Sequence, residues 1–193
     1  MILLDDAHSS STQPTSRVYH KPLQAWCILP SGNPDQDLLA IRNCLEEFTS
    51  ALEKGNYLVA AFAYELGALF HRLPARPAGD KHPLIQAWSF KEYQKLSKDQ
   101  VDALIADQLN HFSSEAQTAG VLDVQESIDQ AQFSKDIARI QEYIRSGDTY
   151  QINHTYRITG KTYGSPLALY SRLRERQPGR FGAYLEHDHQ FIL

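Results

Sequence analysis

Residues 147–157 concentrate side chains that bind polar ligands. We expect a strand to begin near Tyr150, and side chains then alternate between its two faces. Gln151, Asn153 and Arg157 share one face with a threonine hydroxyl. A guanidinium group binds carboxylates, and amides bind neutral oxygens, so this face suits a small polar anion. A half-solvated strand with a polar outer face would show the same alternation, and the pattern alone leaves both interpretations open.

Other kinds of chemistry find little support in the sequence. Cys27 and Cys44 are too few for a disulfide framework or a zinc knuckle. His187 and His189 lie in an expected turn without a third ligand, which is weak evidence for a metal site. A net charge of −4 argues against a general nucleic-acid binder, because such binders neutralise phosphates. Composition therefore does not name a reaction.

The elements that must position these residues follow from hydrophobic periodicity. Apolar residues at helical spacing predict helices through 38–52, 101–112 and 133–144, with Pro34 opening the first and Gly55 and Gly147 ending the first and third. Ser165 and Pro166 form the N-terminal signature of a fourth helix. Expected strands cover residues 56–64, 83–93, 121–125, 181–186 and 190–193. This uneven order of helices and strands favours an α+β class.

The chain has 193 residues, of which 42% are hydrophobic, and this suits a domain with a substantial core. We find no apolar run long enough to cross a membrane and no secretory signal, so we expect a cytoplasmic protein. The sequence stops inside the apolar run 190–193. Because unpaired apolar strand edges are hazardous, we expect a fragment of a longer domain; a short natural terminus docked on a sheet is the alternative.

Three consecutive stretches resemble the chorismate-utilising enzymes. They are residues 143–153 (YIRSGDTYQIN), 164–174 (GSPLALYSRLR) and 177–185 (QPGRFGAYL). Upstream, residues 3–7 (LLDDA) and 57–67 (YLVAAFAYELG) are similar to N-terminal landmarks of that family. Within the family, the chain is most similar to the large component of aminodeoxychorismate synthases. The resemblance spans nearly the whole chain.

The resemblance implies an α+β fold, a two-sheet β-sandwich with outer helices, of which this chain is a truncated part. Residues 1–128 would be the N-terminal region, and residues 129–193 the incomplete start of the chorismate-binding region. The implied reaction transfers ammonia to chorismate and gives 4-amino-4-deoxychorismate for folate synthesis. A glutamine amidotransferase would supply the ammonia. Mg²⁺ would hold the substrate carboxylate through ligands beyond residue 193, so that this chain alone would be inactive.

The resemblance also suggests roles for single residues. In relatives that add water to chorismate, a lysine base occupies the position that Gln151 matches. A neutral amide cannot deprotonate water, but it can hydrogen-bond ammonia or the leaving hydroxyl, so we expect Gln151 to be catalytic. We expect Asn153 and Arg157 to bind substrate. Anthranilate synthase component I, and a non-catalytic binding or docking module, are the alternatives.

Some relatives bind tryptophan at an effector site. The matching positions here are Asp5, Asp6, Arg180, Phe181 and Gly182. Asp6 replaces a serine, and its carboxylate would repel the carboxylate of an amino acid. We therefore expect tryptophan to bind weakly or not at all.

Overall fold

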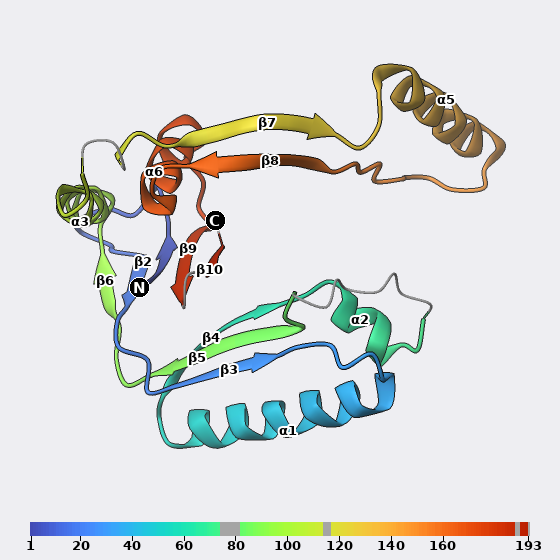
Figure 1. The fold of residues 1–193 in the computed structure, drawn as a ribbon. Coiled ribbons are helices and arrows are strands. Elements are labelled where there is room, and N and C mark those ends of the chain that lie inside the picture. The colour runs from blue at the N-terminus through green and yellow to red at the C-terminus, as the bar shows by residue number, and fades with distance from the viewer. Residues whose placement is uncertain (74–81, 114–116, 188–189, 193) are drawn as a thin grey trace. The chain divides into compact units, whose positions relative to one another are not determined.

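The computed structural model describes residues 1–73, 82–113, 117–187 and 190–192. The chain divides into two compact units, which are described separately below. The first contains Met1–Ala103 and Pro178–Leu193, and the second contains Leu104–Gln177. Figure 1 shows the ribbon and its element labels.

Helix α1 (Pro34–Glu53) of the first unit confirms the first predicted helix. The side-chain oxygen of Asn33 accepts hydrogen bonds from the amides of Asp35 and Gln36, at 3.1 and 3.4 Å, and caps the helix. Gly55, with φ of 75°, follows its C-terminal end. The short helix α2 (Glu65–Phe70) comes after the next strand.

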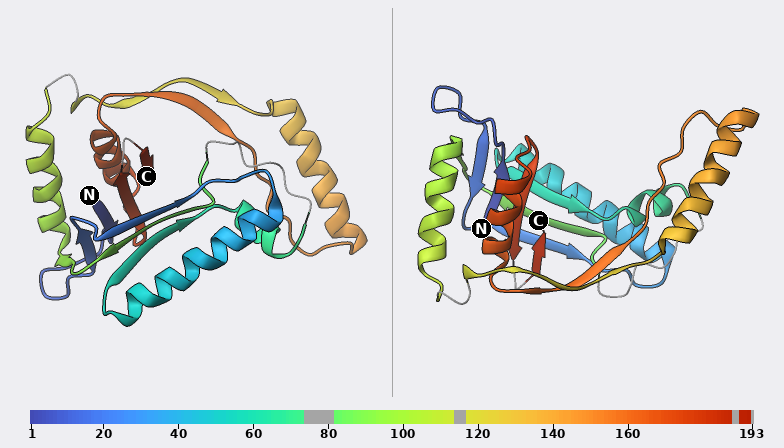
Figure 2. Two further views of the ribbon diagram at one scale, coloured as in Figure 1. Left: turned by 60° about the horizontal axis from the view of Figure 1, so that its bottom comes forward. Right: turned by 90° about the horizontal axis from the view of Figure 1, so that it is seen from above.

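Helix α1 covers one face of a three-stranded antiparallel sheet (Figures 1 and 2). The sheet order is β3-β5-β4, from β3 (Gln24–Ile28), β5 (Ile85–Phe90) and β4 (Tyr57–Phe62). Trp26 of β3 meets Phe48 of α1 edge to face at 5.0 Å, inside the cluster that joins the helix to the sheet. The strands predicted over 56–64 and 83–93 are confirmed as β4 and β5.

A second antiparallel sheet of this unit brings together the two ends of the chain. Its order is β10-β9-β1-β2-β6, from β10 (Gln190–Ile192), β9 (Gly182–His187), β1 (Ile2–Asp5), β2 (Ser16–Tyr19) and β6 (Gln94–Leu96). Asp5 of β1 lies opposite Gly182 of β9. Side chains of both sheets share one buried cluster that includes Ile2, Trp88 and Leu185. Residues 188–189 of the predicted turn 187–189 lie outside the described residues, and His187 is the last residue of β9.

The second unit is built on the two-stranded antiparallel sheet of β7 (Gly120–Glu126) and β8 (Ile158–Tyr163). Its helices α5 (Gln130–Ser146) and α6 (Pro166–Arg176) confirm the third and fourth predictions. Gly147 ends α5 in the left-handed conformation. The Ser165 hydroxyl caps α6 by accepting from the amide of Ala168 at 3.0 Å. Helix α3 (Lys98–Asn110), also predicted, crosses the boundary between the units.

The strand expected from Tyr150 onward is wrong, because residues 150–157 form no regular structure and β8 begins only at Ile158. The physical reason is pairing. Strand β7 pairs with β8 up to Glu126 opposite Ile158, and the chain then turns at Asp129 into α5. Within the described part of the chain, no strand is left beside residues 150–157 to complete a ladder.

The described residues therefore form a mixed structure of helices and antiparallel sheets, which is compatible with the predicted α+β class. None of the described helices combines the length and apolar character that a membrane crossing requires.

Candidate functional site

Gln151 and Asn153 are brought together in the extended segment after α5. The Gln151 side-chain amide donates to the Asn153 side-chain oxygen at 3.3 Å, and both residues are exposed. The Thr149 hydroxyl donates to the Gln151 carbonyl at 3.1 Å and braces the turn. Residues two apart thus lie on one side even without a strand, and they present amide groups to solvent.

Arg157 is placed at the other end of this segment by backbone contacts. Its amide donates to the Ser127 hydroxyl at 2.9 Å, and its carbonyl accepts from the Ser127 amide at 2.8 Å. Among the described residues, its guanidinium forms no ion pair. The structure therefore leaves this cation exposed, and it records no contact between Arg157 and the pair formed by Gln151 and Asn153.

The alternate residues of the same segment pack against α5. The His154 ring lies 5.4 Å from the Phe133 ring, and Tyr156 meets Phe133 edge to face at 6.1 Å. His154 Nε2 is buried and lies 3.8 Å from the Asp136 carboxylate, too far for a hydrogen bond. These contacts hold the segment on the helix and turn its polar residues outward. The sequence analysis did not single out His154. Its only sequence signal was that it alternates with the polar residues Asn153 and Thr155.

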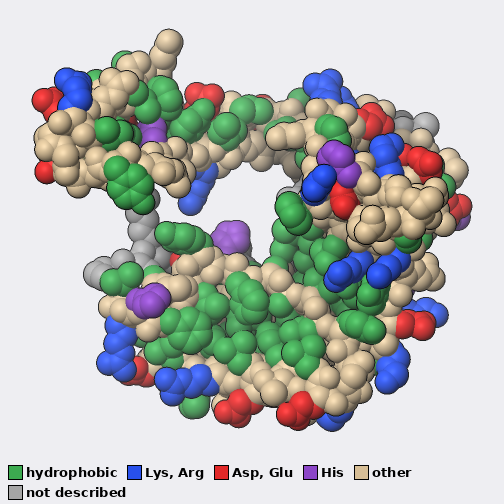
Figure 3. All heavy atoms as spheres, turned by 180° about the vertical axis from the view of Figure 1, so that it is seen from behind, with side chains coloured by type: hydrophobic (Ala, Val, Ile, Leu, Met, Phe, Trp, Pro, Cys, Tyr) green, Lys and Arg blue, Asp and Glu red, His purple; other side chains and the backbone are tan. Residues whose placement is uncertain are grey.

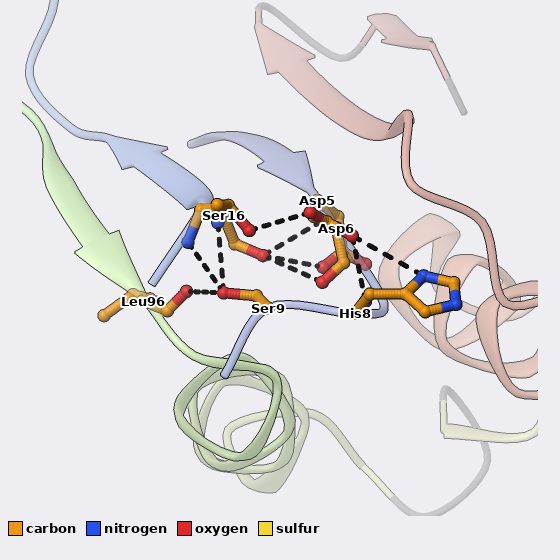
Figure 4. A network of polar contacts seen from close by, with 7 residues as sticks. Asp5, Asp6, His8, Ser9, Ser16 and Leu96 are labelled. Carbon is orange, nitrogen blue, oxygen red and sulfur yellow. Dashed lines mark hydrogen bonds and ion pairs between the residues drawn. The ribbon is translucent and has the colours of Figure 1, made fainter. Parts of the chain in front are cut away.

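The positions that match the effector site come from both ends of the chain, and Figure 4 shows two of them, Asp5 and Asp6. Asp5 is buried, and its carboxylate accepts from the Ser16 hydroxyl at 3.3 Å. The Asp6 carboxylate accepts from the Thr15 hydroxyl at 2.7 Å and from the His8 amide at 2.9 Å. These two hydrogen bonds, with the nearby His8 and Arg180 charges, lower the pKa of Asp6.

The other three matching positions differ in their surroundings. Gly182 pairs with Asp5 in the sheet, and Arg180 lies close enough to act on the Asp6 charge. The Phe181 side chain, by contrast, is 98% exposed. The fold therefore gathers Asp5, Asp6, Arg180 and Gly182, and it leaves the aromatic ring in solvent.

Two buried serines, Ser9 and Ser16, hold this region together (Figure 4). The buried Ser9 hydroxyl donates to the Leu96 carbonyl at 2.7 Å and accepts from the amides of Thr15 and Ser16, at 2.8 and 3.3 Å. The Ser16 hydroxyl accepts from the Asp6 amide at 2.9 Å. A serine-rich stretch favours turns, so its sequence gave no sign of burial.

The described part of the chain contains no recognisable metal site. No three His, Cys, Asp or Glu side chains gather there in a way that could hold an ion. Mg²⁺ needs octahedral coordination by oxygen ligands, usually one or two carboxylates with water and substrate. The described residues therefore do not provide a recognisable Mg²⁺ site.

Comparison with known proteins gives several partial matches. A segment of 54 residues, 28% of this chain, is 39% identical to aminodeoxychorismate synthase component 1 of Bacillus subtilis and covers 12% of that protein. A longer segment of 150 residues, 68% of this chain, is 27% identical to the protein of the same name from Klebsiella aerogenes and covers 32% of it.

A match to a differently named protein is also present. A segment of 76 residues, 39% of this chain, is 28% identical to anthranilate synthase component 1 3 of Haloarcula marismortui and covers 15% of that protein. The chain thus spans at most about a third of the length of these relatives.

The family model for chorismate binding enzymes matches residues 10–193, which is nearly the whole chain. The match includes the segment that carries Gln151, Asn153 and Arg157. On this evidence, the chain belongs to the chorismate-binding enzyme family.

Proposed function

We propose that this chain is the N-terminal part of an aminodeoxychorismate synthase component 1, an enzyme that replaces the 4-hydroxyl of chorismate with an amino group for folate synthesis. Relatives of that name from Bacillus subtilis, Streptomyces lividans and Klebsiella aerogenes support this choice. The proposal concerns the whole enzyme, because the matched segments cover only 12 to 32% of these relatives.

The observation that carries the proposal is the neutral, exposed side chain at Gln151. Its amide group already acts as a donor, toward Asn153 at 3.3 Å, and its oxygen can accept a hydrogen bond. An amide cannot remove a proton from water, but it can orient ammonia or hydrogen-bond the departing hydroxyl. Gln151 therefore favours delivery of nitrogen over delivery of oxygen.

Substrate recognition would use the neighbouring polar groups. Chorismate carries two carboxylates, and the exposed guanidinium of Arg157 offers a charge-assisted partner for one of them. Asn153 would bind a neutral oxygen of the ring. In this proposal, Gln151, Asn153 and Arg157 line one side of the substrate.

The proposed enzyme domain is a two-sheet β-sandwich with outer helices, in which residues 1–128 form the N-terminal region and residues 129–193 begin the chorismate-binding region. Exposed apolar side chains support a larger domain. Val121, Leu122, Val124 and Ile158 of the β7–β8 sheet are each 47 to 59% exposed, and α5 buries none of its described residues. Apolar surface of this kind is stabilised when further elements cover it.

The proposal also includes partners outside this chain. A glutamine amidotransferase would supply ammonia, and the enzyme would work in the cytoplasm. Mg²⁺ ligands would lie beyond residue 193, and no step of the proposed mechanism is assigned to a metal held by the described residues.

Product analysis of the full-length enzyme tests the proposal. With chorismate, ammonium and Mg²⁺, we expect 4-amino-4-deoxychorismate. Gln151→Ala should lower turnover by at least about tenfold, because a positioned hydrogen-bonding group is lost. Gln141→Ala, an exposed glutamine on α5, is the matched control and should keep full activity. A hydroxylated isomer as the main product, or equal turnover of the two variants, would refute the proposal.

Anthranilate synthase component 1 is the second candidate, and the Haloarcula marismortui relative of that name favours it. Both reactions use chorismate and ammonia, so Gln151 does not distinguish between them. The same assay separates them, because anthranilate would replace 4-amino-4-deoxychorismate as the product.

A further inference from the structure

Two connections between the sheets of the first unit form a pocket that contains none of Gln151, Asn153 and Arg157. Residues 20–23 lead from β2 to β3, and residues 91–93 lead from β5 to β6. The amide of Leu23 donates to the Ser89 carbonyl at 2.8 Å and holds the first connection to β5. A pocket of about 440 Å³ lies at this place, within the usual size range of small-molecule sites.

Basic residues outnumber acidic ones in the lining of the pocket. His20, Lys21 and Lys91 face a single acid, Glu92. Among the described residues, neither Lys21 nor Lys91 forms an ion pair. Two lysine charges without a partner at one concave surface favour a bound anion.

An aromatic group provides the apolar wall. Tyr93 lines the pocket, and its ring packs on Tyr19 at 5.3 Å and edge to face on Tyr57 at 4.8 Å. The Arg17 guanidinium lies 5.5 Å from the centre of the same ring. Tyr93 is thus fixed by its neighbours, and buried Val18 continues the apolar surface.

The backbone of Lys21 and the pKa of His20 are both unusual. Lys21 has a φ of 53°, a conformation that residues with a side chain rarely adopt. Such strained positions cluster at functional sites. Partial burial is the main cause of the lowered pKa of His20, and the positive charges of the chain's amino terminus and of Lys21 lower it further.

We propose that this pocket binds a small carboxylate that carries a flat ring. Lys21 and Lys91 contact the carboxylate, and the ring lies against Tyr93 and Val18. None of these residues belongs to the candidate site that contains Gln151, so the inference does not depend on the proposed function.

Benzoate is the probe, and titration of this chain by calorimetry and NMR is the test. Saturable binding of benzoate is expected, with acetate and benzyl alcohol each binding more weakly because each lacks one half of the ligand.

Substitutions of the pocket lysines test whether benzoate binds in this pocket. The double variant Lys21→Gln with Lys91→Gln should weaken benzoate binding about tenfold, the effect of losing two exposed charge partners. Lys54→Gln, at the exposed end of α1, is the matched control and should bind as the parent does. The proposal is overturned if benzoate does not saturate, if benzyl alcohol or acetate binds as tightly, or if the double variant binds like the control.

Discussion

Replacing Ser9 with alanine tests the polar network near the amino terminus. Ser9 is 5% exposed, and its hydroxyl joins the loop before β2 to the end of β6 through three hydrogen bonds. Alanine fills nearly the same space, so the change removes these bonds and little packing. The variant therefore isolates the contribution of one hydroxyl group.

The expected magnitude follows from the groups that lose their partners. The amide of Ser16 belongs to a residue with no exposed surface, and water cannot easily replace the lost acceptor. The Leu96 carbonyl is partly buried, whereas Thr15 is exposed and its amide can bind water. One buried and one partly buried group without partners cost about 2 kcal/mol of unfolding free energy. For a chain of 193 residues, the melting temperature should fall by about 4–8 °C.

Urea denaturation followed by circular dichroism measures the effect, with Ser10→Ala as the matched control. Ser10 is the next residue in the same loop, but it is exposed, and its hydroxyl lies 3.2 Å from the hydroxyl of Thr12. The unfolding free energy of the control should fall by less than about 0.5 kcal/mol, as is usual for substitutions of surface residues. Equal losses in the two variants would show that the network around Ser9 does not stabilise the fold as argued.

Three further predictions concern backbone strain, pH and the effector site. Gly164→Ala should destabilise the chain more than Gly147→Ala. Both glycines have positive φ, but of the two only Gly164 lies where an added Cβ would meet other backbone, that of Thr118 and Ala119. Thermal melts should show a loss of unfolding free energy of about 1 kcal/mol for Gly147→Ala and a clearly larger loss for Gly164→Ala. The pKa of Asp6 is lowered in the folded chain, so the contribution of its carboxylate to stability is present above about pH 3.9 and is lost as the pH falls through the pKa of the folded state. In Asp6→Asn, the unfolding free energy should therefore depend less on pH in this acidic range. An unchanged dependence on pH would contradict this. Tryptophan should bind the full-length protein weakly or not at all, because the Asp6 carboxylate would repel its carboxylate; calorimetry that detects micromolar affinity would refute this.

The sequence by itself determined those elements whose signals are local. Helix α1 follows from apolar residues at helical spacing with a proline at its start, and α6 follows from Ser165 and Pro166. The strands β4 and β5 follow from short apolar runs. In the two helices, the backbone hydrogen bonds and the caps that decide the structure involve residues close together in the chain. For β4 and β5 the signal in the sequence is local, although the strand pairing that stabilises them joins distant segments.

Only the tertiary structure decided which distant segments meet. Asp5 and Gly182 pair across the whole length of the chain, and Ser9 reaches the carbonyl of Leu96. Residues 150–157 show the converse: their alternating pattern predicted a strand, but no described strand lies beside them. A strand is stabilised by a neighbour, whose presence no local pattern reveals, so the conformation of the segment that carries Gln151 depends on tertiary contacts.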